Sequence, residues 1–596
     1  MSSKTIHKLR SLFFTPDSWF ELWVRSLYHR LARTKLLFWL RDWLARRSYK
    51  KYRQQQRAEK PPELASQTAQ PIITFLVDHL KNHDNQLTAT IASIQNLEIG
   101  RWQVLVVCDP SSYSDPQVSE IKSESPFQII DLDQHDWLEA VKGEFVIFCQ
   151  AGDQFFPTLL ARFYHLFAQN PNADLVYYDC EIRPPDQPFP WPVFKPCKPS
   201  PALCLSYNPF SRGLFRTTSL RHHLNKNDPH EGFLLKEYAL SLMLLEHKAQ
   251  IAHIPSVLVS QSNLVKSDSP EVREMICEYL ARSGAHAPSA RETQWGTNFQ
   301  WSHGDRDPSL AIIIPSKNNA SLLRPLVQSI FGNNHHQALT VTIVDNNSDD
   351  AETLALYREI QKEHQVQVLP YRKPFNFSEA INLGVQATAS DLILLMNDDM
   401  APLDALWLPE MIQWTQLEDV GVVGAKLLRT NHTLQHVGII MGLVGFAGHI
   451  YLNAPEHYRG LWGSSDWYRD LLAVTGACQM MRRKVFEQVG GYDPGFKLAF
   501  GDIDFCLRVY KQGYRNIYTP FARLYHYEGQ SRGYVTPIQD TLRGYERFET
   551  FLLQDDPYFS PNLTYSRIPQ CAGSRTTLEE RRQQIEIRKS FYLHHH

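Results

Sequence analysis

The sequence predicts an α/β fold made of two tandem domains, each built on a mainly parallel sheet. Short apolar runs alternate with helix-length segments, a rhythm typical of parallel sheets covered by helices. This rhythm occurs twice, at about residues 70–300 and at about 305–535. The length of 596 residues and the apolar content of 43% are ordinary for a chain of two or three folded domains. We expect a helical arm at 1–60 before these domains and a helical tail at 536–596 after them.

Residues 1–60 carry a positive charge that the rest of the chain does not share. They hold fifteen Lys and Arg against four Asp and Glu, a net of +11, which leaves −13 for the remainder. Within residues 17–47, Trp and Leu recur at helical spacings among arginines, as in helices that lie in the headgroup layer of an anionic membrane. The alternative is a helical arm packed on the protein's own body. The apolar runs are too short to span a bilayer.

The arm therefore predicts association with a membrane surface. Nucleic acid is not expected as a partner, because Trp-rich amphipathic spacing favours lipid. Nine scattered cysteines without a CxxC pair favour a reduced compartment. The basic start is not followed by the apolar segment and cleavage site of a secretory signal. We expect a cytoplasmic protein, peripherally associated with the inner face of the cell membrane.

The elements of both domains can be placed from local composition. Residues 50–70 are polar and contain two adjacent prolines, which predicts a linker. Residues 437–455 lack Lys, Arg, Asp and Glu and are rich in glycine, which predicts a flexible loop beside a site rather than a membrane span. The predicted strands are Ile72–Val77, Val104–Cys108, Phe145–Cys149, Leu175–Tyr178, Leu310–Ile314, Val341–Val344, Val366–Leu369 and Leu392–Met396. The predicted helices of the second domain are residues 320–331, 351–363 and 377–388.

One strand of the second domain ends abruptly in two carboxylates, Asp398 and Asp399. In open α/β sheets, ligands bind beyond the carboxyl ends of the strands. Two adjacent carboxylates repel each other there, and hard oxygen ligands suit Mg²⁺ or Mn²⁺. Such a cation can bridge the two phosphates of a nucleotide sugar and neutralise the departing diphosphate. The alternative for this pair is a solvated turn.

Two further segments of the second domain place polar residues or glycine near this strand end. Asp345 follows a strand and precedes turn-forming residues. It could accept a hydrogen bond from a base N–H or a ribose hydroxyl, or it could simply belong to a turn. Asn382 and Gly384 lie on the helix before the Asp-Asp strand. A glycine there permits close approach of a ligand or close packing of helix on sheet, and both remain open.

Asp502 and Asp504 begin a predicted helix in the segment Gly501-Asp-Ile-Asp. A carboxylate at a helix N-terminus is favoured by the helix dipole, so one interpretation is helix capping. The functional interpretation is that one carboxylate takes the proton from an acceptor hydroxyl as that hydroxyl attacks an anomeric carbon.

Taken in order along residues 305–535, these segments resemble the family 2 glycosyltransferases, inverting enzymes with the GT-A fold. Each motif alone is weak, and the ordered set is specific. The motifs are Ile-Ile-Ile-Pro-Ser at 312–316, Val-Asp-Asn-Asn-Ser at 344–348, Asn-Leu-Gly at 382–384, Asn-Asp-Asp at 397–399, Thr475-Gly476 with Arg482-Arg483, Gly490 to Phe496, Gly-Asp-Ile-Asp at 501–504, and His526. Gly501 departs from the family, which usually has Glu at that position.

The resemblance implies a role for each matched residue. Asp502 matches the catalytic base, and Asp399 and His526 match ligands of a divalent cation, Mn²⁺ or Mg²⁺. The donor-binding positions implied in this way are Pro315, Asp345, Asn382, Gly384 and Asp398. Thr475, Gly476 and Asp504 match positions that contact the acceptor or support the site.

The first domain resembles the same family in an eroded form. Gln150 and Gly152 replace two of the usual acids and leave Asp153, while Ser260 stands where a His is expected. Glu237 lies near the expected base. We expect this domain to be catalytically silent and to bind acceptor or glycan or support the second domain; a second active site is the alternative.

The resemblance implies a metal-dependent transferase that moves a sugar from a UDP, dTDP or GDP donor to a glycan or lipid-linked acceptor in bacterial surface polysaccharide synthesis, such as O-antigen. One alternative is a non-catalytic glycan-binding or scaffold protein built from two retired transferase domains, against which the retained acids argue. A nucleotidyltransferase would normally carry a glycine-rich, basic phosphate loop near its first strand, and residues 315–320 do not form one.

Overall fold

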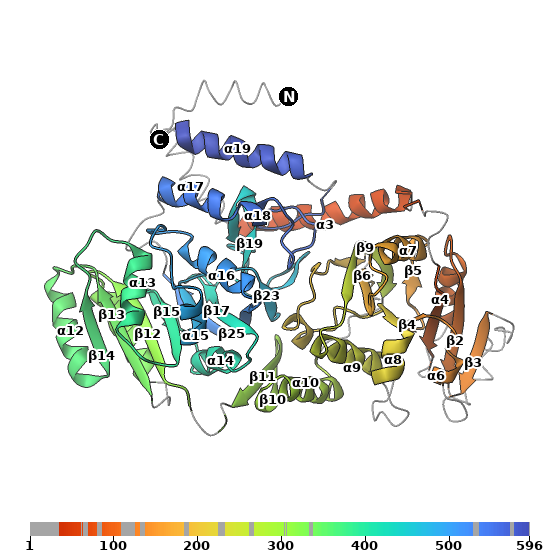
Figure 1. Ribbon diagram of the computed structural model, residues 1–596, viewed down its shortest axis with the longest axis horizontal. Helices are drawn as coiled ribbons and strands as arrows, with labels where there is room; N and C mark the ends of the chain where they lie inside the picture. The colour runs from red at the N-terminus through yellow and green to blue at the C-terminus, as the bar shows by residue number, and fades with distance from the viewer. Residues whose placement is uncertain are drawn as a thin grey trace.

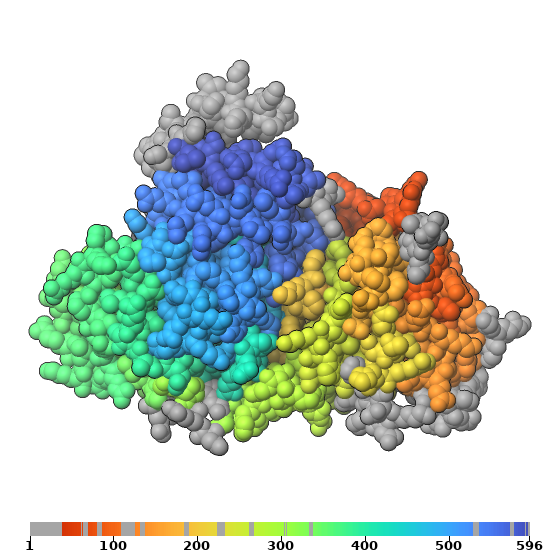
Figure 2. Space-filling model, viewed as in Figure 1, coloured from red at the N-terminus to blue at the C-terminus, as the bar shows by residue number. Residues whose placement is uncertain are grey.

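A computed structural model shows two α/β domains side by side, with the C-terminal helices above them (Figure 1). In the space-filling view the domains meet along a continuous seam (Figure 2). The structure describes residues 35–60, 62–63, 70–79, 86–108, 126–131, 137–183, 190–223, 233–261, 267–302, 304, 307–332, 338–527, 536–572 and 577–594. Part of the predicted arm, residues 1–34, lies outside the described residues.

The N-terminal domain contains a sheet with the strand order β3-β2-β1-β4-β8-β6-β9-β5, and β7 pairs with β6. Its strands are β1 (Ile73–Asp78), β2 (Trp102–Cys108), β3 (Phe127–Asp131), β4 (Phe145–Gln150), β5 (Gln154–Phe155), β6 (Leu175–Ile182), β7 (Trp191–Val193), β8 (Leu214–Arg216) and β9 (Ile251–Gln261). Its helices are α4 (Leu87–Gln95), α6 (Trp137–Ala140), α7 (Leu159–Gln169), η2 (Leu203–Leu205), α8 (Thr217–His223), α9 (Phe233–Glu246) and α10 (Pro270–Arg282). A hairpin of β10 (His286–Thr293) and β11 (Gly296–Ser302) follows.

The C-terminal domain contains a sheet with the order β14-β13-β12-β15-β24-β17-β25-β16, and β18 pairs with β17 and β23 with β25. Its main strands are β12 (Leu310–Ser316), β13 (Leu339–Asp345), β14 (Val366–Pro370), β15 (Leu392–Met396), β16 (Met400–Pro402), β17 (Val420–Leu428), β18 (Leu434–His436), β23 (Arg469–Leu471), β24 (Cys478–Arg482) and β25 (Arg515–His526). Its helices are α11 (Ala320–Gly332), α12 (Ala351–Glu363), α13 (Phe377–Gln386), α14 (Trp407–Trp414), α15 (Arg483–Gln488) and α16 (Gly501–Lys511).

The two sheets repeat one arrangement strand for strand. Parallel neighbours form one half of each sheet, where β1 lies between β2 and β4 and β12 lies between β13 and β15. The antiparallel strands β8 and β24 then follow β4 and β15. The predicted α/β class with two tandem, mainly parallel sheets is confirmed.

Residues 437–455 differ from the flexible loop that the sequence predicts. They form β19 (Ile439–Met441), η3 (Leu443–Gly445) and β20 (Ala447–His449), and β19 pairs with β20. Ile440, Ile450 and Tyr451 are fully buried in the core of the C-terminal domain. The prediction of a flexible loop is wrong because the glycines serve tight turns between apolar residues that pack inward. The short strands β21 (Arg459–Gly460) and β22 (Gly463–Ser464) follow.

Helix α3 (Lys35–Ala58) corrects the predicted linker at 50–70, because the helix continues to Ala58. One face of α3 packs on both domains. Tyr49 donates to Glu181 Oε2 at 2.5 Å in the N-terminal domain, and Asp42 accepts from Tyr458 OH at 2.7 Å in the C-terminal domain. Polar residues at 50–58 favoured a linker in the sequence, yet they lie on a helix whose Tyr49 and Tyr52 are buried.

The C-terminal residues form α17 (Ile538–Arg547), α18 (Glu549–Leu552), a loop and α19 (Leu578–His594). The loop reaches the N-terminal domain, where Asn562 donates to Asp179 Oδ2 at 2.8 Å. A second buried contact joins the domains, because Asp470 accepts from Ser200 Oγ at 2.6 Å and pairs with Arg515 at 2.7 Å. Among the residues that the structure describes, every helix is too short or too polar to serve as a membrane span.

Candidate functional site

The carboxylate pair lies at the end of β15, as the sequence predicts. Asp398 and Asp399 are both buried, at 8% and 5% exposure. Asp398 accepts a hydrogen bond of 2.8 Å from the hydroxyl of Ser316, the last residue of the neighbouring strand β12. Pro315 precedes Ser316 on that strand, so it lies at the same edge of the sheet. An apolar, fully buried strand holds the two acids at this edge, and the hydroxyl contact fixes one of them.

His526 ends β25 and lies directly opposite Met400, the residue after Asp399. This register brings His526 Nε2 to 3.3 Å from Asp399 Oδ1, so the two predicted metal ligands meet. The imidazole is 7% exposed, and its Nδ1 is buried without a hydrogen-bond partner among the described residues. The nitrogen that faces Asp399 is Nε2, and a carboxylate beside an imidazole nitrogen has the donor chemistry that a divalent transition-metal ion accepts.

The protein side chains alone supply few ligands. Within the described part of the chain, no cluster of three or more His, Cys, Asp or Glu side chains forms a complete metal site. Mg²⁺ is commonly held by one or two carboxylates together with substrate phosphates and water. Asp399 and His526 therefore fit a cation that shares its coordination with a diphosphate, and they do not fit a permanently bound structural ion.

Asp502 is the second residue of α16 and is partly exposed. Its Oδ2 accepts from Gly476 N at 2.8 Å, and its Oδ1 accepts from the backbone of Ile503 at 2.9 Å. Burial raises the pKa of Asp502 above its usual range, and these two backbone N–H groups oppose the shift. A carboxylate with a raised pKa is suited to act as a base towards a hydroxyl, because it binds the proton more strongly.

Asp502 and the carboxylate pair belong to one edge of the sheet. Asn397 N, in the loop that carries Asp398 and Asp399, donates to Ala477 O at 3.0 Å. Ala477 follows Gly476, whose N–H binds Asp502. A side chain at Gly476 would place its Cβ 3.1 Å from Asp502 Cβ, so glycine permits this close approach. Two hydrogen bonds, from Asn397 N to Ala477 O and from Gly476 N to Asp502, therefore connect the loop of Asp398 and Asp399 with the first turn of α16.

Asp345 ends β13 at the same edge, where Ser316 on β12 is its partner in register. It accepts from Tyr357 OH at 3.1 Å and from Ser348 N at 3.2 Å. Burial raises the pKa of the Tyr357 phenol, with a contribution from Asp345, so the phenol remains a donor to this carboxylate. Asp345 is partly exposed and keeps lone pairs for a ligand.

Three other predicted residues make contacts that support the site. Asn382 donates to Tyr492 O at 2.8 Å and accepts from Tyr492 N at 2.9 Å, which fixes the turn before α16. A Cβ at Gly384 would lie 2.4 Å from Ile313 Cγ2, so glycine lets α13 pack on β12. Asp504 is buried and pairs with Arg508 at 2.7 Å. The donor-binding roles of Asn382 and Gly384 and the acceptor role of Asp504 stay predictions.

A histidine pair beside Thr475 was not singled out by the sequence as part of the site. His436 Nε2 accepts from Thr475 N at 3.4 Å, and His436 Nδ1 lies 2.9 Å from His449 Nδ1. Burial, reinforced by His449 and His526, holds the pKa of His436 well below its usual range, so this ring is neutral. The signal available in the sequence was two histidines that flank a glycine-rich stretch without charges.

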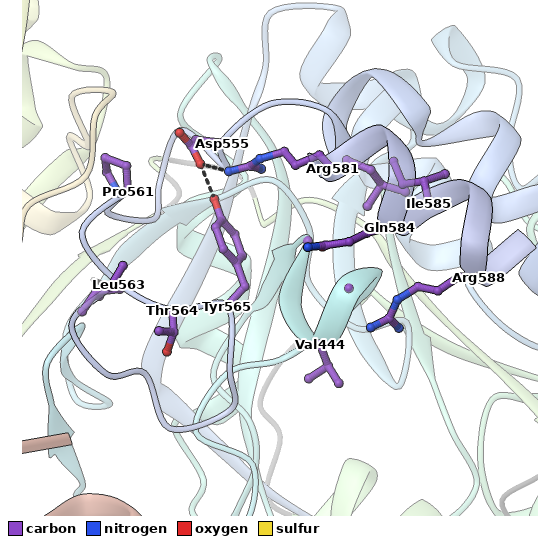
Figure 3. Close-up of a pocket in the computed structure, with 14 residues that line it drawn as sticks. Val444, Asp555, Pro561, Leu563, Thr564, Tyr565, Arg581, Gln584, Ile585 and Arg588 are labelled. Atoms are coloured by element: carbon purple, nitrogen blue, oxygen red, sulfur yellow. Dashed lines mark hydrogen bonds and ion pairs between the residues drawn. The ribbon is translucent and has the colours of Figure 1, made fainter. Parts of the chain in front are cut away.

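A cavity of about 460 Å³ lies away from these residues, between η3, the C-terminal loop and α19 (Figure 3). Arg581 and Arg588 of α19 point into it, and Asp555 pairs with Arg581 and with Tyr565 OH. None of the predicted site residues lines this cavity. The cavity therefore gives no support to the site, which stands on its hydrogen-bond geometry.

Comparison with known proteins shows which families and proteins the chain resembles. Residues 311–490 match the family described as glycosyl transferase family 2. The O-antigen biosynthesis protein RfbC of Myxococcus xanthus is 29% identical over 531 residues, which cover 84% of this chain and 41% of that relative. The uncharacterized protein y4gI of Sinorhizobium fredii is 28% identical over 549 residues, 83% of this chain and 58% of that protein. The C-terminal α/β domain is therefore similar to the family 2 glycosyltransferases over the matched residues.

Other matches are partial. The chain spans about half the length of the two relatives just described. An N-acetylglucosaminyl-diphospho-decaprenol L-rhamnosyltransferase of Mycobacterium tuberculosis is 24% identical over 217 residues, 33% of this chain and 68% of that enzyme. A mannosyltransferase of Pyrobaculum calidifontis, solved with GDP-Man and Mn²⁺, overlays with a TM-score of 0.32 at 15% identity, covering 49% of this chain and 73% of that one.

Proposed function

We propose that the C-terminal domain transfers a sugar from a nucleotide-sugar donor to an acceptor hydroxyl with inversion at the anomeric carbon. The observation that carries this proposal is the meeting of Asp399 and His526 at 3.3 Å on the sheet edge that also holds Asp502. These three groups come from distant parts of the chain, and hydrogen bonds of Asn397 with Ala477 and of Gly476 with Asp502 connect the segments that carry them. Each group has the chemistry of one step: phosphate binding through a cation, or removal of a proton.

In the proposed reaction, Asp502 accepts the proton of the acceptor hydroxyl while its oxygen bonds to the anomeric carbon. The bond from that carbon to the diphosphate breaks, and the electron pair leaves with the nucleoside diphosphate. A divalent cation, when bound by Asp399 and His526, supplies positive charge to the departing diphosphate. Asp345 accepts a hydrogen bond from the base or the ribose of the donor. Asp398, which is held by the hydroxyl of Ser316, orients the ribose or the ligands of the cation.

The printed names of two relatives support a more specific substrate. The rhamnosyltransferase acts, by its name, on an acceptor that carries a diphospho-decaprenol lipid. The Myxococcus relative is described as an O-antigen biosynthesis protein. We extend both to this chain as a proposal: the acceptor is a glycan or a lipid-linked glycan, and the product is a bacterial surface polysaccharide.

Helix α3 supports the proposal that the protein lies on a membrane. Its unburied face presents Trp39, Leu40 and Trp43 at 57%, 50% and 51% exposure. The guanidinium of Arg47 lies 5.1 Å from the ring centre of Trp43, so positive charge flanks the apolar side chains. Exposed Trp and Leu beside Arg match an anionic bilayer surface in both apolar and charged character. The packed face of α3 would hold the active domain close to that surface.

The enzymatic proposal is tested with the full chain, Mn²⁺ or Mg²⁺, and a panel of UDP, dTDP and GDP sugars. We expect one donor class to raise the unfolding temperature only with metal and to be hydrolysed slowly. Asp502→Asn should retain this stabilisation and lose about 10²–10⁴-fold in rate, whereas Asp399→Asn should lose the stabilisation. The exposed residue Asp307 provides a matched control, because Asp307→Asn should change neither. Full activity in Asp502→Asn would sink the assignment of the base.

The membrane proposal is tested by sedimentation with vesicles of anionic and of zwitterionic lipid. The double substitution Trp39→Glu and Trp43→Glu should abolish binding to anionic vesicles, because it places charge on the apolar face. Leu354→Glu, at an exposed leucine of α12, is the matched control and should bind normally. Equal binding by the double variant and the control would refute the role of α3.

A further inference from the structure

The N-terminal domain has a buried ionic cluster at the sheet edge that corresponds to the carboxylate edge of the C-terminal domain. Asp153 directly precedes β5, just as Asp399 directly precedes β16. The next residue in each domain shows the equivalence by register, because Gln154 faces Ser260 and Met400 faces His526. Ser260 therefore occupies the position of the histidine ligand. The N-terminal domain thus keeps a carboxylate, Asp153, at this edge and has no imidazole at position 260.

The side chain of Arg212 fills this edge. It is fully buried, as are Asp153 and Glu237. Its Nε lies 2.6 Å from Asp153 Oδ2 and its Nη2 lies 3.4 Å from Asp153 Oδ1, so the guanidinium holds the carboxylate with two nitrogens. Its Nη1 lies 4.0 Å from Glu237 Oε2, and its Nη2 donates to Gln150 Oε1 at 3.3 Å. A bidentate arginine pair of this kind is among the strongest charge-assisted contacts.

Glu237 corresponds to the proposed base of the C-terminal domain by its hydrogen bond. Arg212 N donates to Glu237 Oε1 at 2.5 Å, as Gly476 N donates to Asp502 Oδ2 at 2.8 Å. Both acceptors lie on the second helix after the donor residue, α9 or α16. Where the C-terminal domain has Gly476, the N-terminal domain thus has Arg212. Its φ of 63° is in the left-handed region, and the surrounding contacts hold this unfavoured conformation.

We propose that the guanidinium of Arg212 permanently replaces the divalent cation in the N-terminal domain, so that the chain binds one metal and one donor, not two. This inference rests on the proposed function of the C-terminal domain. The Arg212 guanidinium is covalently part of the chain and is buried away from solvent. Neither free metal nor a donor diphosphate therefore reaches Asp153. The domain then acts as a folded support, joined to the catalytic domain through Asp470 and Asn562.

The charges at Asp153 and Glu237 agree with Arg212 as the cation that contacts Asp153. Burial raises the pKa of Glu237 to about 8, despite the opposing effect of Arg212, so this carboxyl is largely protonated near neutral pH. Arg212 then pairs one positive charge with the one negative charge of Asp153. A divalent ion in the same place would need more negative ligands than this edge offers, because Ser260, Gln150 and Gly152 are uncharged.

The first test counts bound Mn²⁺ by electron paramagnetic resonance, using the full chain with Mn²⁺ and the nucleoside diphosphate of the stabilising donor. The expected result is one Mn²⁺ per chain for the wild type, one for Asp153→Asn and none for Asp399→Asn. Two ions in the wild type, or one remaining in Asp399→Asn, would overturn the inference. A wild type that binds no Mn²⁺ would instead contradict the proposed function, so the two failures are distinguishable.

The second test removes the internal cation. Arg212→Ala leaves two buried carboxyl groups around an empty volume, and we expect a lower unfolding temperature that millimolar guanidinium, but not Mn²⁺, raises by several degrees. Arg183→Ala, at an arginine that is 46% exposed and 3.8 Å from Glu181, is the control and should show no such rescue. Equal responses in the two variants would refute the replacement. If Arg212→Ala does not accumulate as a folded protein, the Mn²⁺ count alone decides the question.

Discussion

Replacement of Gly384 by alanine separates helix packing from donor binding. Gly384 lies on α13, and an added Cβ would lie 2.4 Å from Ile313 Cγ2 and 3.0 Å from Val344 Cγ2. Ordinary carbon contacts are about 3.5–4.0 Å, so α13 or the sheet must move by roughly 1 Å. Overpacking of this kind costs about 1–3 kcal/mol, and the better helix propensity of alanine returns about 1 kcal/mol. Because the contact is severe, we expect a net loss of about 2 kcal/mol.

That loss corresponds to a fall of roughly 4–8 °C in the unfolding temperature of a domain of this size, measured by calorimetry. Gly332→Ala is the matched control, because a Cβ at this position in the last turn of α11 meets nothing within 4 Å, and it should not lower the unfolding temperature. Donor affinity of folded Gly384→Ala, measured by calorimetric titration, should change little. An unchanged unfolding temperature with lost donor affinity would refute the packing role and favour direct contact with the donor.

Three further predictions concern the environments of carboxyl groups. Since burial raises the pKa of Asp502, the transfer rate should fall with decreasing pH at a value above the usual Asp range, and a rate independent of pH from 4 to 8, as measured in buffered initial-rate assays, would contradict this. Burial raises the pKa of Glu410 from 4.5 to about 8, so between these values only the unfolded state loses the proton and stability falls as pH rises. In urea unfolding, Glu410→Gln should therefore gain stability relative to the wild type as pH rises from about 5 to 8, and a constant difference would refute this. Asp470→Ala should cost about 1–3 kcal/mol in the same assay, because it removes the acceptor of Ser200 Oγ and leaves Arg515 with the exposed Asp419 alone, and a loss below 1 kcal/mol would contradict the contact.

Strand positions were predictable because buried parallel strands are apolar runs of limited length. Leu392–Met396 is fully buried and ends at the acids that the sequence singled out. Asp399 and His526 are 127 positions apart in the chain, and their meeting depends on the pairing of β16 with β25. Local pattern carries no information on such a register, and the expectation came from resemblance to a family.

The errors arose where tertiary contacts override local composition. Residues 50–58 are polar and still helical, because Tyr49 and Tyr52 pack beneath them. Residues 437–455 are rich in glycine and still ordered, because their apolar side chains join the core. Arg212 was not singled out, since an arginine in a loop is usually exposed and only the fold shows it enclosed between two carboxyl groups.

The contact of Asn562 with Asp179 joins positions 383 residues apart and has a consequence for dissection of the protein. A fragment cut near residue 300 would separate the two sheets cleanly by sequence, yet it would leave the N-terminal half without the segment that covers Asp179 and Pro255. The C-terminal loop that carries Asn562 is therefore part of the packing of the N-terminal domain. Complementary fragments mixed in solution should reassemble more readily than either persists alone.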